Sequence, residues 1–260
     1  MNKKSIAARI LLSLSVSMFA MSAFAGTEPD YSAWNAILTK HYNPEKGMDY
    51  KGLKATHMAE LNKLNDMMGK VNVNALDRKQ QQAYWMNYYN ISVVSLIAEK
   101  YPLKSIRDLD GFLPYGVFLK DRVMVNGSKT SLKKMEDEKI RAGFKDPRVH
   151  FAINCAAKSC PPLRTEAYTG EKLDMQLDEQ ARKFLNGPTG VRIEKNGDET
   201  IFNTTKIMDW FKKDFADWGG GALAFSKKYL DANHMKPLQG ASKVTIKYDD
   251  YSWALNDASK

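Results

Sequence analysis

Residues 77–100 form the segment that most constrains the fold. The middle of this segment, from Tyr84 to Ile91, reads Tyr-Trp-Met-Asn-Tyr-Tyr-Asn-Ile and is apolar on most sides of a helix. A helix at the surface carries one apolar stripe, whereas a helix that is apolar all round is buried. Pro102 follows the segment and would end a helix there. The sequence therefore predicts a long buried helix over residues 77–100.

Two segments before this helix also show helical periodicity. We expect a short helix over residues 30–41 and a second helix through residues 58–68, because apolar residues recur there at the helical spacing. The apolar positions are Trp34, Ile37, Leu38, Met58, Leu61, Leu64 and Met68. The N-terminal part of the chain is therefore expected to be helical.

Two Asn-Gly pairs predict hairpins in the second half of the chain. Asn126-Gly127 lies within residues 122–131, and Asn196-Gly197 lies between the short apolar runs 191–193 and 200–202. Both residues of such a pair tolerate positive φ, which a two-residue hairpin turn requires. Each pair is therefore expected to be a two-residue turn between short strands.

The remaining elements of the second half are short helices and strands. Ser131, Thr169 and Thr205 are expected to start helices, because Ser and Thr side chains cap helix N-termini. The first is expected to run to about Ala142 and the second to Leu185. The expected strands are residues 149–154 and 244–246. Helices come first and short strands later, which indicates an α+β fold.

The N-terminus has the pattern of a secretory signal peptide. Lys3, Lys4 and Arg9 precede an uncharged apolar run, and Ala23-Phe24-Ala25 is a small-x-small cleavage signal. We expect residues 1–25 to be removed, leaving a single domain at residues 26–260 that is periplasmic or secreted. An uncleaved N-terminal anchor is the alternative, although the run is short for a transmembrane helix.

The charge of the chain favours a mixed, solvated surface. The formal net charge is +9, and removal of three of the 39 basic residues leaves 36 against 30 acidic residues, or +6 for residues 26–260. Basic and acidic residues alternate, as in residues 133–139, and such mixing favours an ordinary surface over a nucleic-acid site. A small-molecule or peptide ligand is the expected partner, with no nucleic acid and no membrane span. No cofactor is expected.

Residues 146–164 contain the side chains best suited to chemistry. His150, Asn154 and Cys155 are expected to lie along a strand that ends in a loop with Ser159 and Cys160. A cysteine nucleophile needs a base. His150 and Cys155 would face opposite sides of a straight strand, about 16 Å apart at ~3.3 Å per residue. Cys160 could instead fold back to His150.

The two cysteines have three possible roles. They could form a disulfide, which an oxidising compartment permits. One of them could be a nucleophile paired with His150, which Glu136 would then orient. A zinc site is one ligand short, because His150 with Cys155 and Cys160 gives three ligands and a closed site uses four. No metal is therefore expected.

Other polar and aromatic residues have a binding and a structural interpretation. Asn87 and Asn90 share one helix face, and either could orient an imidazole or bond to nearby backbone. Arg164, with Arg107, could hold a ligand carboxylate or form structural ion pairs. The tryptophans Trp85, Trp210 and Trp253 are expected in the core because their neighbours are apolar.

Several motifs of the chain occur together in one known family. They are Tyr84–Asn90, Ser105–Asp108, Asn154–Arg164, Ala167–Thr169 and Tyr251–Asn256. With them the chain resembles the domain of unknown function 547 family over roughly residues 49–256. The resemblance implies little about activity. Many relatives have Glu-His where this chain has Glu136-Asp137, so no role for that His carries over. Some relatives have Ser at the place of Cys160, which implies that a disulfide here is a local feature.

Two functions remain open from the sequence. One is a cysteine-dependent amide hydrolase or acyl transferase acting on a peptide-like small substrate. This hypothesis is only loosely papain-like, and the order of His before Cys departs from papain. The other is a non-enzymatic binding or scaffold domain in which a Cys155–Cys160 disulfide fixes a recognition loop. In both cases residues 150–164 are expected to line a concave site, with His150 facing into it. Asn87, Asn154, Ser159 and Arg164 are the expected substrate-binding residues.

Overall fold

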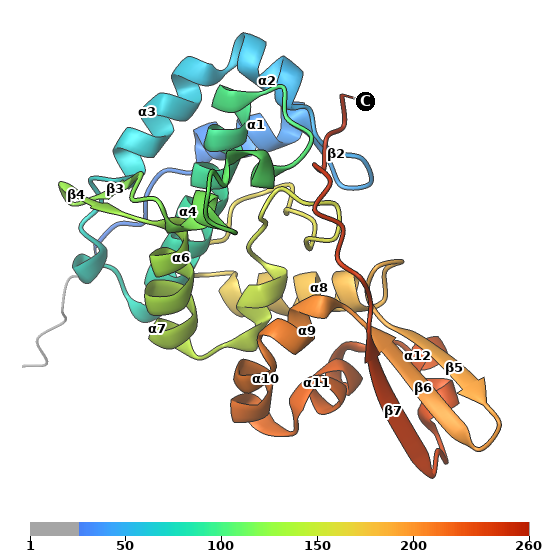
Figure 1. Ribbon diagram of the computed structural model, residues 1–260. Helices are drawn as coiled ribbons and strands as arrows, with labels where there is room; N and C mark the ends of the chain where they lie inside the picture. Colours follow the sequence, from blue (N-terminus) through green and yellow to red (C-terminus); the bar gives the residue numbers. More distant parts are fainter. Residues whose placement is uncertain (1–25, 260) are drawn as a thin grey trace, which may run out of the picture.

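The structure of the chain, a computed structural model, describes residues 26–259 (Figure 1). The signal peptide predicted for residues 1–25 lies outside the described residues. The described part combines many helices with small sheets of two or three strands, which confirms the α+β class. None of its helices has both the length and the apolar character needed to cross a membrane.

The long buried helix is confirmed as α4, Arg78–Lys100. Asp77 caps its N-terminus, since the Asp77 side chain accepts from the backbone of Gln80 and the Gln80 side chain accepts from the backbone of Asp77. Such a reciprocal pair satisfies two backbone donors that a helix start leaves free. Every residue from Gln82 to Val94 is buried, as expected for a helix that is apolar on most sides.

The N-terminal part has three further helices, of which the second and third pack against α4 and the first packs against those two (Figure 1). They are α1 Ser32–His41, α2 Tyr50–Thr56 and α3 Met58–Met68, and the first and third confirm the helices expected from periodicity. Between α1 and α2 lies a small two-stranded pair that the sequence did not indicate. Its strands are β1 Tyr42–Asn43 and β2 Gly47–Met48.

The first predicted hairpin is confirmed. Its strands are β3 Val123–Val125 and β4 Ser128–Thr130, and Val125 pairs with Ser128 across the turn. Asn126 has φ 48° and Gly127 has φ 78°, the positive values that a two-residue turn of this kind needs. The chain then enters a helix that Ser131 caps, as expected. This helix comprises α6 Leu132–Lys134, the π-helical segment η3 Met135–Arg141 and α7 Ala142–Phe144.

The strand predicted over residues 149–154 is wrong. Residues Pro147–Phe151 form a 3-10 helix, η4, and Asp146 caps its start. The apolar residues of this segment do not share one face of a sheet. Val149 packs in one hydrophobic core and Phe151 in another, so a tight helical turn serves both cores. The separation expected for His150 and Cys155 along a strand therefore does not apply.

Two further element boundaries differ from the sequence prediction. Helix α8 spans Leu173–Leu185, and Thr169 does not cap it. The backbone of Thr169 instead donates to the side chain of Gln176, which lies inside the helix. In the second hairpin Asn196 pairs with Glu199, so the two-residue turn is Gly197-Asp198, one position later than expected. Gly197 has φ 60° and supplies the positive value needed at the start of the turn.

The C-terminal part is a three-stranded sheet with helices beside it (Figure 1). Strands β5 Arg192–Asn196 and β6 Glu199–Thr204 are antiparallel, and β7 Lys243–Tyr248 runs parallel to β6. Thr205 caps α9, as expected. The helices here are α9 Lys206–Trp210, α10 Lys212–Gly219, α11 Gly221–Tyr229 and α12 Ala232–Met235. The other short helical elements are η1 Val73–Ala75, η2 Ile106–Leu109, α5 Gly116–Leu119 and η5 Lys236–Leu238.

The apolar side chains gather into two hydrophobic cores. The larger core surrounds α4 and includes residues from α1, α2 and α3. The smaller core lies among α8, α10, α11 and the three-stranded sheet, and it is rich in aromatic rings. Its aromatic members are Phe151, Phe184, Phe202, Phe215, Phe225 and Tyr229. Segment η4 contributes to both cores and thereby joins them.

Candidate functional site

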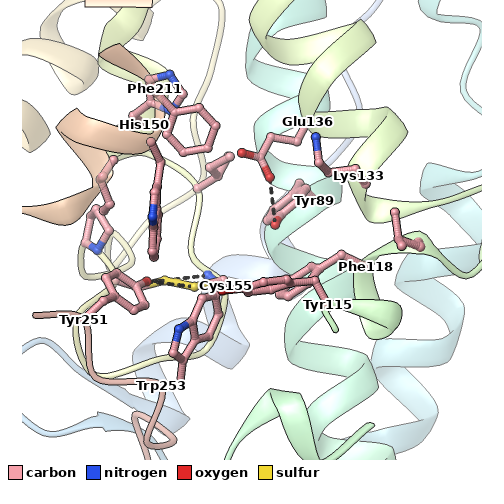
Figure 2. A pocket seen from close by; sticks show the side chains of 16 residues that line it. Tyr89, Tyr115, Phe118, Lys133, Glu136, His150, Cys155, Phe211, Tyr251 and Trp253 are labelled. Carbon is pink, nitrogen blue, oxygen red and sulfur yellow. Dashed lines mark hydrogen bonds between the residues drawn. A yellow bond between two sulfur atoms is a disulfide. The ribbon is translucent and has the colours of Figure 1, made fainter. Parts of the chain in front are cut away.

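A cavity of about 340 Å³ lies where the two cores meet (Figure 2). One wall comes from α4, α5 and η3. The opposite wall comes from η4, α9 and the C-terminal segment that follows β7, which contains Tyr251 and Trp253. The lining residues are Tyr89, Tyr115, Phe118, Leu119, Lys133, Glu136, His150, Ile153, Cys155, Cys160, Pro161, Ile207, Trp210, Phe211, Tyr251 and Trp253. The cavity is therefore mainly aromatic and apolar, with few polar groups.

Cys155 and Cys160 form a disulfide in the cavity wall, with their sulfur atoms 2.19 Å apart. A disulfide sulfur carries no hydrogen, so the Tyr251 hydroxyl is the donor toward both sulfurs, at 3.1 and 3.0 Å. The backbone N–H of Cys155 also donates to the sulfur of Cys160, at 2.9 Å. Of the three roles that the sequence left open for the two cysteines, the structure therefore shows the disulfide. Neither sulfur is a nucleophilic thiolate in this state.

His150 faces the cavity but bonds to a residue that the sequence did not indicate. Its Nε2 lies 2.8 Å from the carboxylate of Asp214 on α10, and its ring stacks on Phe211 at 4.1 Å between centroids. The side chain is only 1% exposed. Asp214 follows His150 by 64 residues, and no local pattern marks it as a partner.

The His150–Asp214 pair favours a neutral imidazole and an ionised carboxylate. Burial lowers the pKa of His150, although the hydrogen bond to Asp214 opposes this change. Partial burial of Asp214 acts against its ionisation. Hydrogen bonds from His150 and Arg141 outweigh that effect and lower the pKa of the carboxyl. Arg141 also lies over the ring of Phe211, at 4.5 Å, and so braces the same wall.

Glu136 does not orient His150, contrary to the prediction from the sequence. The carboxylate of Asp214 on α10 has that position beside His150, whereas Glu136 on η3 lies against Tyr89 of α4. The Glu136 carboxylate lies 3.5 Å from the Tyr89 hydroxyl (Figure 2). Burial raises the pKa of Glu136 to about 7, and the adjacent Asp137 adds to this increase. The cavity thus contains a carboxyl group that titrates near neutral pH.

The cations close to Glu136 are paired with its neighbour Asp137. Lys133 forms an ion pair with Asp137 one helical turn away. Arg141 lies 2.6 Å from Asp137 and also pairs with Asp214, at 2.7 Å. Asp137 therefore bridges the two cations, and the described residues form no ion pair with Glu136.

Asn87 and Asn90 are bonded to backbone, as in their structural interpretation. Asn87 donates to the carbonyl of Tyr168 at 2.8 Å and accepts from its N–H at 3.0 Å. Asn90 donates to the carbonyl of Ala152 and accepts from the N–H of Asn154. Both amides are buried and neither lines the cavity. They fix the segments on either side of the disulfide loop to α4.

The other predicted substrate-binding residues also lie outside the cavity lining. Asn154 donates to the Pro161 carbonyl and lines a second cavity, of about 700 Å³, on the far side of Cys160. The Ser159 hydroxyl accepts from the backbone of Ser252. Arg164 forms ion pairs with Glu166 and Glu179, the structural alternative left open for it. Among residues 26–259 no group of three His, Cys, Asp or Glu side chains is arranged to hold a metal.

The aromatic residues of the C-terminal segment are the part of the site that the sequence analysis missed. Trp85 is buried as expected, but Trp210 is 42% exposed and lines the cavity, so its placement in the core was wrong. Tyr251 packs against Trp210 and Trp253, with ring centroids 4.7 and 4.8 Å apart. The signal available was the Tyr-Ser-Trp motif at residues 251–253, which contributes to the family resemblance but does not reveal its own partners.

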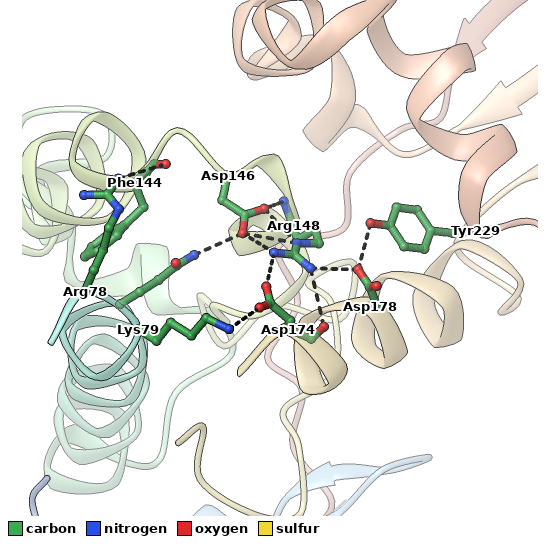
Figure 3. Close-up of polar contacts among 9 residues, drawn as sticks. Arg78, Lys79, Phe144, Asp146, Arg148, Asp174, Asp178 and Tyr229 are labelled. Atoms are coloured by element: carbon green, nitrogen blue, oxygen red, sulfur yellow. Dashed lines mark hydrogen bonds and ion pairs between the residues drawn. The ribbon is translucent and has the colours of Figure 1, made fainter. Parts of the chain in front are cut away.

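An ion-pair cluster whose residues lie outside the cavity lining holds η4 (Figure 3). Arg148 is the centre of this cluster and pairs with Asp146, Asp174 and Asp178 at 2.7–2.8 Å. Lys79 on α4 also pairs with Asp174. Because Arg148 is two residues before His150, these contacts fix the turn that presents the imidazole to the cavity.

Comparison with known proteins gives one match. Residues 73–185 match the model of the family described as protein of unknown function, DUF547. No curated protein and no solved structure matches the chain. The matched range includes α4, η3, η4 and both cysteines, and it ends before the aromatic residues of α9 and the C-terminal segment.

Proposed function

The chain belongs to the DUF547 family through residues 73–185, and from this premise we propose that it binds a small organic ligand in the cavity between its two cores. The observation that carries the proposal is the intact Cys155–Cys160 disulfide in the wall of an aromatic cavity. A site with a fixed wall and no free thiol is suited to binding. The ligand has a mainly apolar body, and it is a small molecule or a side chain of a peptide.

The size and lining of the cavity support this proposal. Small-molecule sites have volumes of roughly 300–1,000 Å³ and are lined mainly by apolar and aromatic residues with a few polar groups. The cavity, at about 340 Å³, meets both conditions. Its walls are also well fixed, since the disulfide closes a short loop and the Tyr251 hydroxyl bonds to both sulfurs. A fixed wall reduces the entropy lost when a ligand binds.

Titration with a neutral fluorescent probe tests the proposal. Prodan emission shifts to shorter wavelength in an apolar site, so we expect a saturable shift with the oxidised protein. The Cys155→Ser/Cys160→Ser double variant should bind Prodan more weakly, because its loop is no longer closed. Circular dichroism would confirm that the variant is folded. Absence of saturable binding by the oxidised protein would contradict the proposal.

A cysteine-dependent hydrolase or acyl transferase is the second candidate, and one observation favours it. The four residues proposed for that chemistry, Glu136, His150, Cys155 and Cys160, all line the same cavity. This activity requires a reduced protein, because the thiolate is the nucleophile. Iodoacetamide labelling separates the two functions. For a binding site we expect no labelling until the disulfide is reduced. Labelling of one cysteine in the native protein, with a pKa well below the ordinary ~8.5, would favour the enzyme.

We also propose that binding takes place in the periplasm or outside the cell. The support is the signal-peptide pattern of residues 1–25 and the disulfide, which persists in oxidising compartments. The intact mass of the exported protein tests this proposal. A chain that begins at Gly26 is the expected result, and a mass that includes residues 1–25 would contradict it.

A further inference from the structure

The charged groups around Glu136 leave one negative charge in excess. Three carboxylates occur at or beside the cavity, on Glu136, Asp137 and Asp214, and two cations, Lys133 and Arg141, accompany them. A third cation, Arg107, lies over two rings of the lining but is paired with Asp110, so that pair adds no net charge. The other titratable groups facing Glu136 are the tyrosine hydroxyls of Tyr89 and Tyr251 and the imidazole of His150. Burial favours the neutral form of all three. A ligand cation would therefore balance the charge of the cavity.

The aromatic rings of the cavity provide faces for such a cation. An ammonium group within about 6 Å of the face of a Trp or Tyr ring is attracted by the negative charge of that face. Arg107 already lies over Tyr115 and Trp253, and Arg141 lies over Phe211. No cation of the described residues lies over Trp210 or Tyr251, and both of these rings line the cavity.

The small number of acceptors distinguishes among ammonium ions. A primary ammonium has three N–H donors, and each needs an acceptor when it is buried. The acceptors of the lining are the Glu136 carboxylate and a few hydroxyl and imidazole groups, including the oxygen of Tyr251, and most of the other lining side chains are aromatic or apolar. A quaternary ammonium has no N–H and needs only a negative charge and ring faces. The lining therefore fits an alkylated ammonium better than a primary one.

We infer that the cavity binds a quaternary ammonium group, held between the carboxylate of Glu136 and the rings of Trp210 and Tyr251. This inference rests on the proposed binding function and names the class of ligand. A neutral ligand that accepts a hydrogen bond from protonated Glu136 is the competing possibility. The two predict opposite pH dependences, because the first needs the ionised carboxyl and the second needs the protonated one.

Displacement of Prodan by two matched probes tests the inference. Choline carries a quaternary nitrogen, and 3,3-dimethylbutan-1-ol has the same shape with a neutral carbon in that place. At about pH 8 we expect choline to displace Prodan at a concentration about tenfold lower than the alcohol. Since the pKa of Glu136 is about 7, the affinity for choline should fall about tenfold between about pH 8 and about pH 6. The affinity for the alcohol should not fall.

Two variants on the same helical segment complete the test. Glu136→Gln should abolish the preference for choline, whereas Glu138→Gln, an exposed residue two positions later, should retain it. The inference is overturned if the alcohol displaces Prodan as well as choline does, if neither probe displaces it, or if Glu136→Gln keeps the preference. The pH series uses only the unmodified protein, so it tests the inference even if a variant fails to fold. Prodan must bind before either probe can displace it. If Prodan itself does not bind, that result contradicts the proposed function.

Discussion

The two hydrophobic cores of the molecule differ in how they are built, and the cavity lies where they meet. The larger core surrounds one long helix, α4, and takes most of its buried residues from the part of the chain that ends with that helix. The smaller core has no helix as long as α4 and joins several shorter elements, η4, α8, the sheet and the helices α10 and α11. The larger core contributes Tyr89 and Phe118 to the cavity, and Phe211, which packs against the smaller core, lines the other side. The side chains that line the cavity thus lie at the edges of the two cores.

The largest expected effect comes from weakening the connection between the cores. Phe151 is fully buried in the smaller core, although its neighbours Val149 and Ala152 lie in the larger one. Phe151→Ala should lower the free energy of unfolding by about 3–5 kcal/mol, through lost burial and the space left behind. Urea unfolding followed by circular dichroism measures this change.

The matched control for that substitution is Phe112→Ala. Phe112 is fully exposed in the loop before α5, so the same truncation should change the free energy of unfolding by less than about 0.5 kcal/mol. Equal effects of the two substitutions would show that η4 does not join the cores as described.

A smaller effect on the free energy of unfolding is expected from substitution of Glu136, which lies on the larger-core side of the cavity. The pKa of this carboxyl is raised from 4.5 to about 7, so the folded state holds its proton more tightly than the unfolded state. The contribution to stability is therefore present below about pH 4.5 and is lost as the pH rises through 7. Glu136→Gln should be more stable than the unmodified protein at about pH 8, by at most about 3 kcal/mol. Thermal unfolding across this pH range measures the difference.

The corresponding control is Glu138→Gln. Glu138 is exposed on the same segment, and the substitution should give a stability difference that does not change between about pH 5 and pH 8. A Glu136→Gln difference that is equally flat with pH would contradict the placement of this carboxyl in a desolvated cavity.

The disulfide should change the free energy of unfolding by less than the substitution of Phe151 or of Glu136 does. Cys155 and Cys160 are five positions apart, so the bond closes a short loop. The chain-entropy relation gives about 2 kcal/mol for a loop of this length. The Cys155→Ser/Cys160→Ser variant should lose about that much stability in urea unfolding. Loss of Prodan binding without loss of stability would show that the disulfide shapes the cavity but does not stabilise the fold. A loss several times larger would place it at the centre of both cores.

The larger core could be predicted from sequence, and the smaller core could not in the same detail. Helices α1, α3 and α4 follow from local apolar periodicity, and Asn126-Gly127 sets its own hairpin turn. Segment η4 was misread as a strand because a run of β-branched and aromatic residues has no distinctive period when its members serve two cores.

The candidate site could likewise be predicted only in part from the sequence. His150, Cys155, Cys160 and Glu136 were identified by residue type, and all line one cavity. Their partners Asp214 and Tyr251 follow His150 and Cys155 by 64 and 96 residues, and only tertiary packing brings them close. Residue type thus indicated which side chains carry chemistry, while the tertiary structure determined what they contact.

Prodan affinity for two tryptophan variants, one in α5 and one in the segment before it, tests the central claim most directly. Leu119 is half exposed and lines the cavity, whereas Leu113 is exposed in the same region and does not line it. Leu119→Trp should narrow the cavity and weaken Prodan binding about tenfold or more, equivalent to ~1.4 kcal/mol. Leu113→Trp should leave the affinity within about twofold, or ~0.4 kcal/mol. Equal affinities for the two variants would show that the probe binds elsewhere, and that the cavity between the cores is not the ligand site.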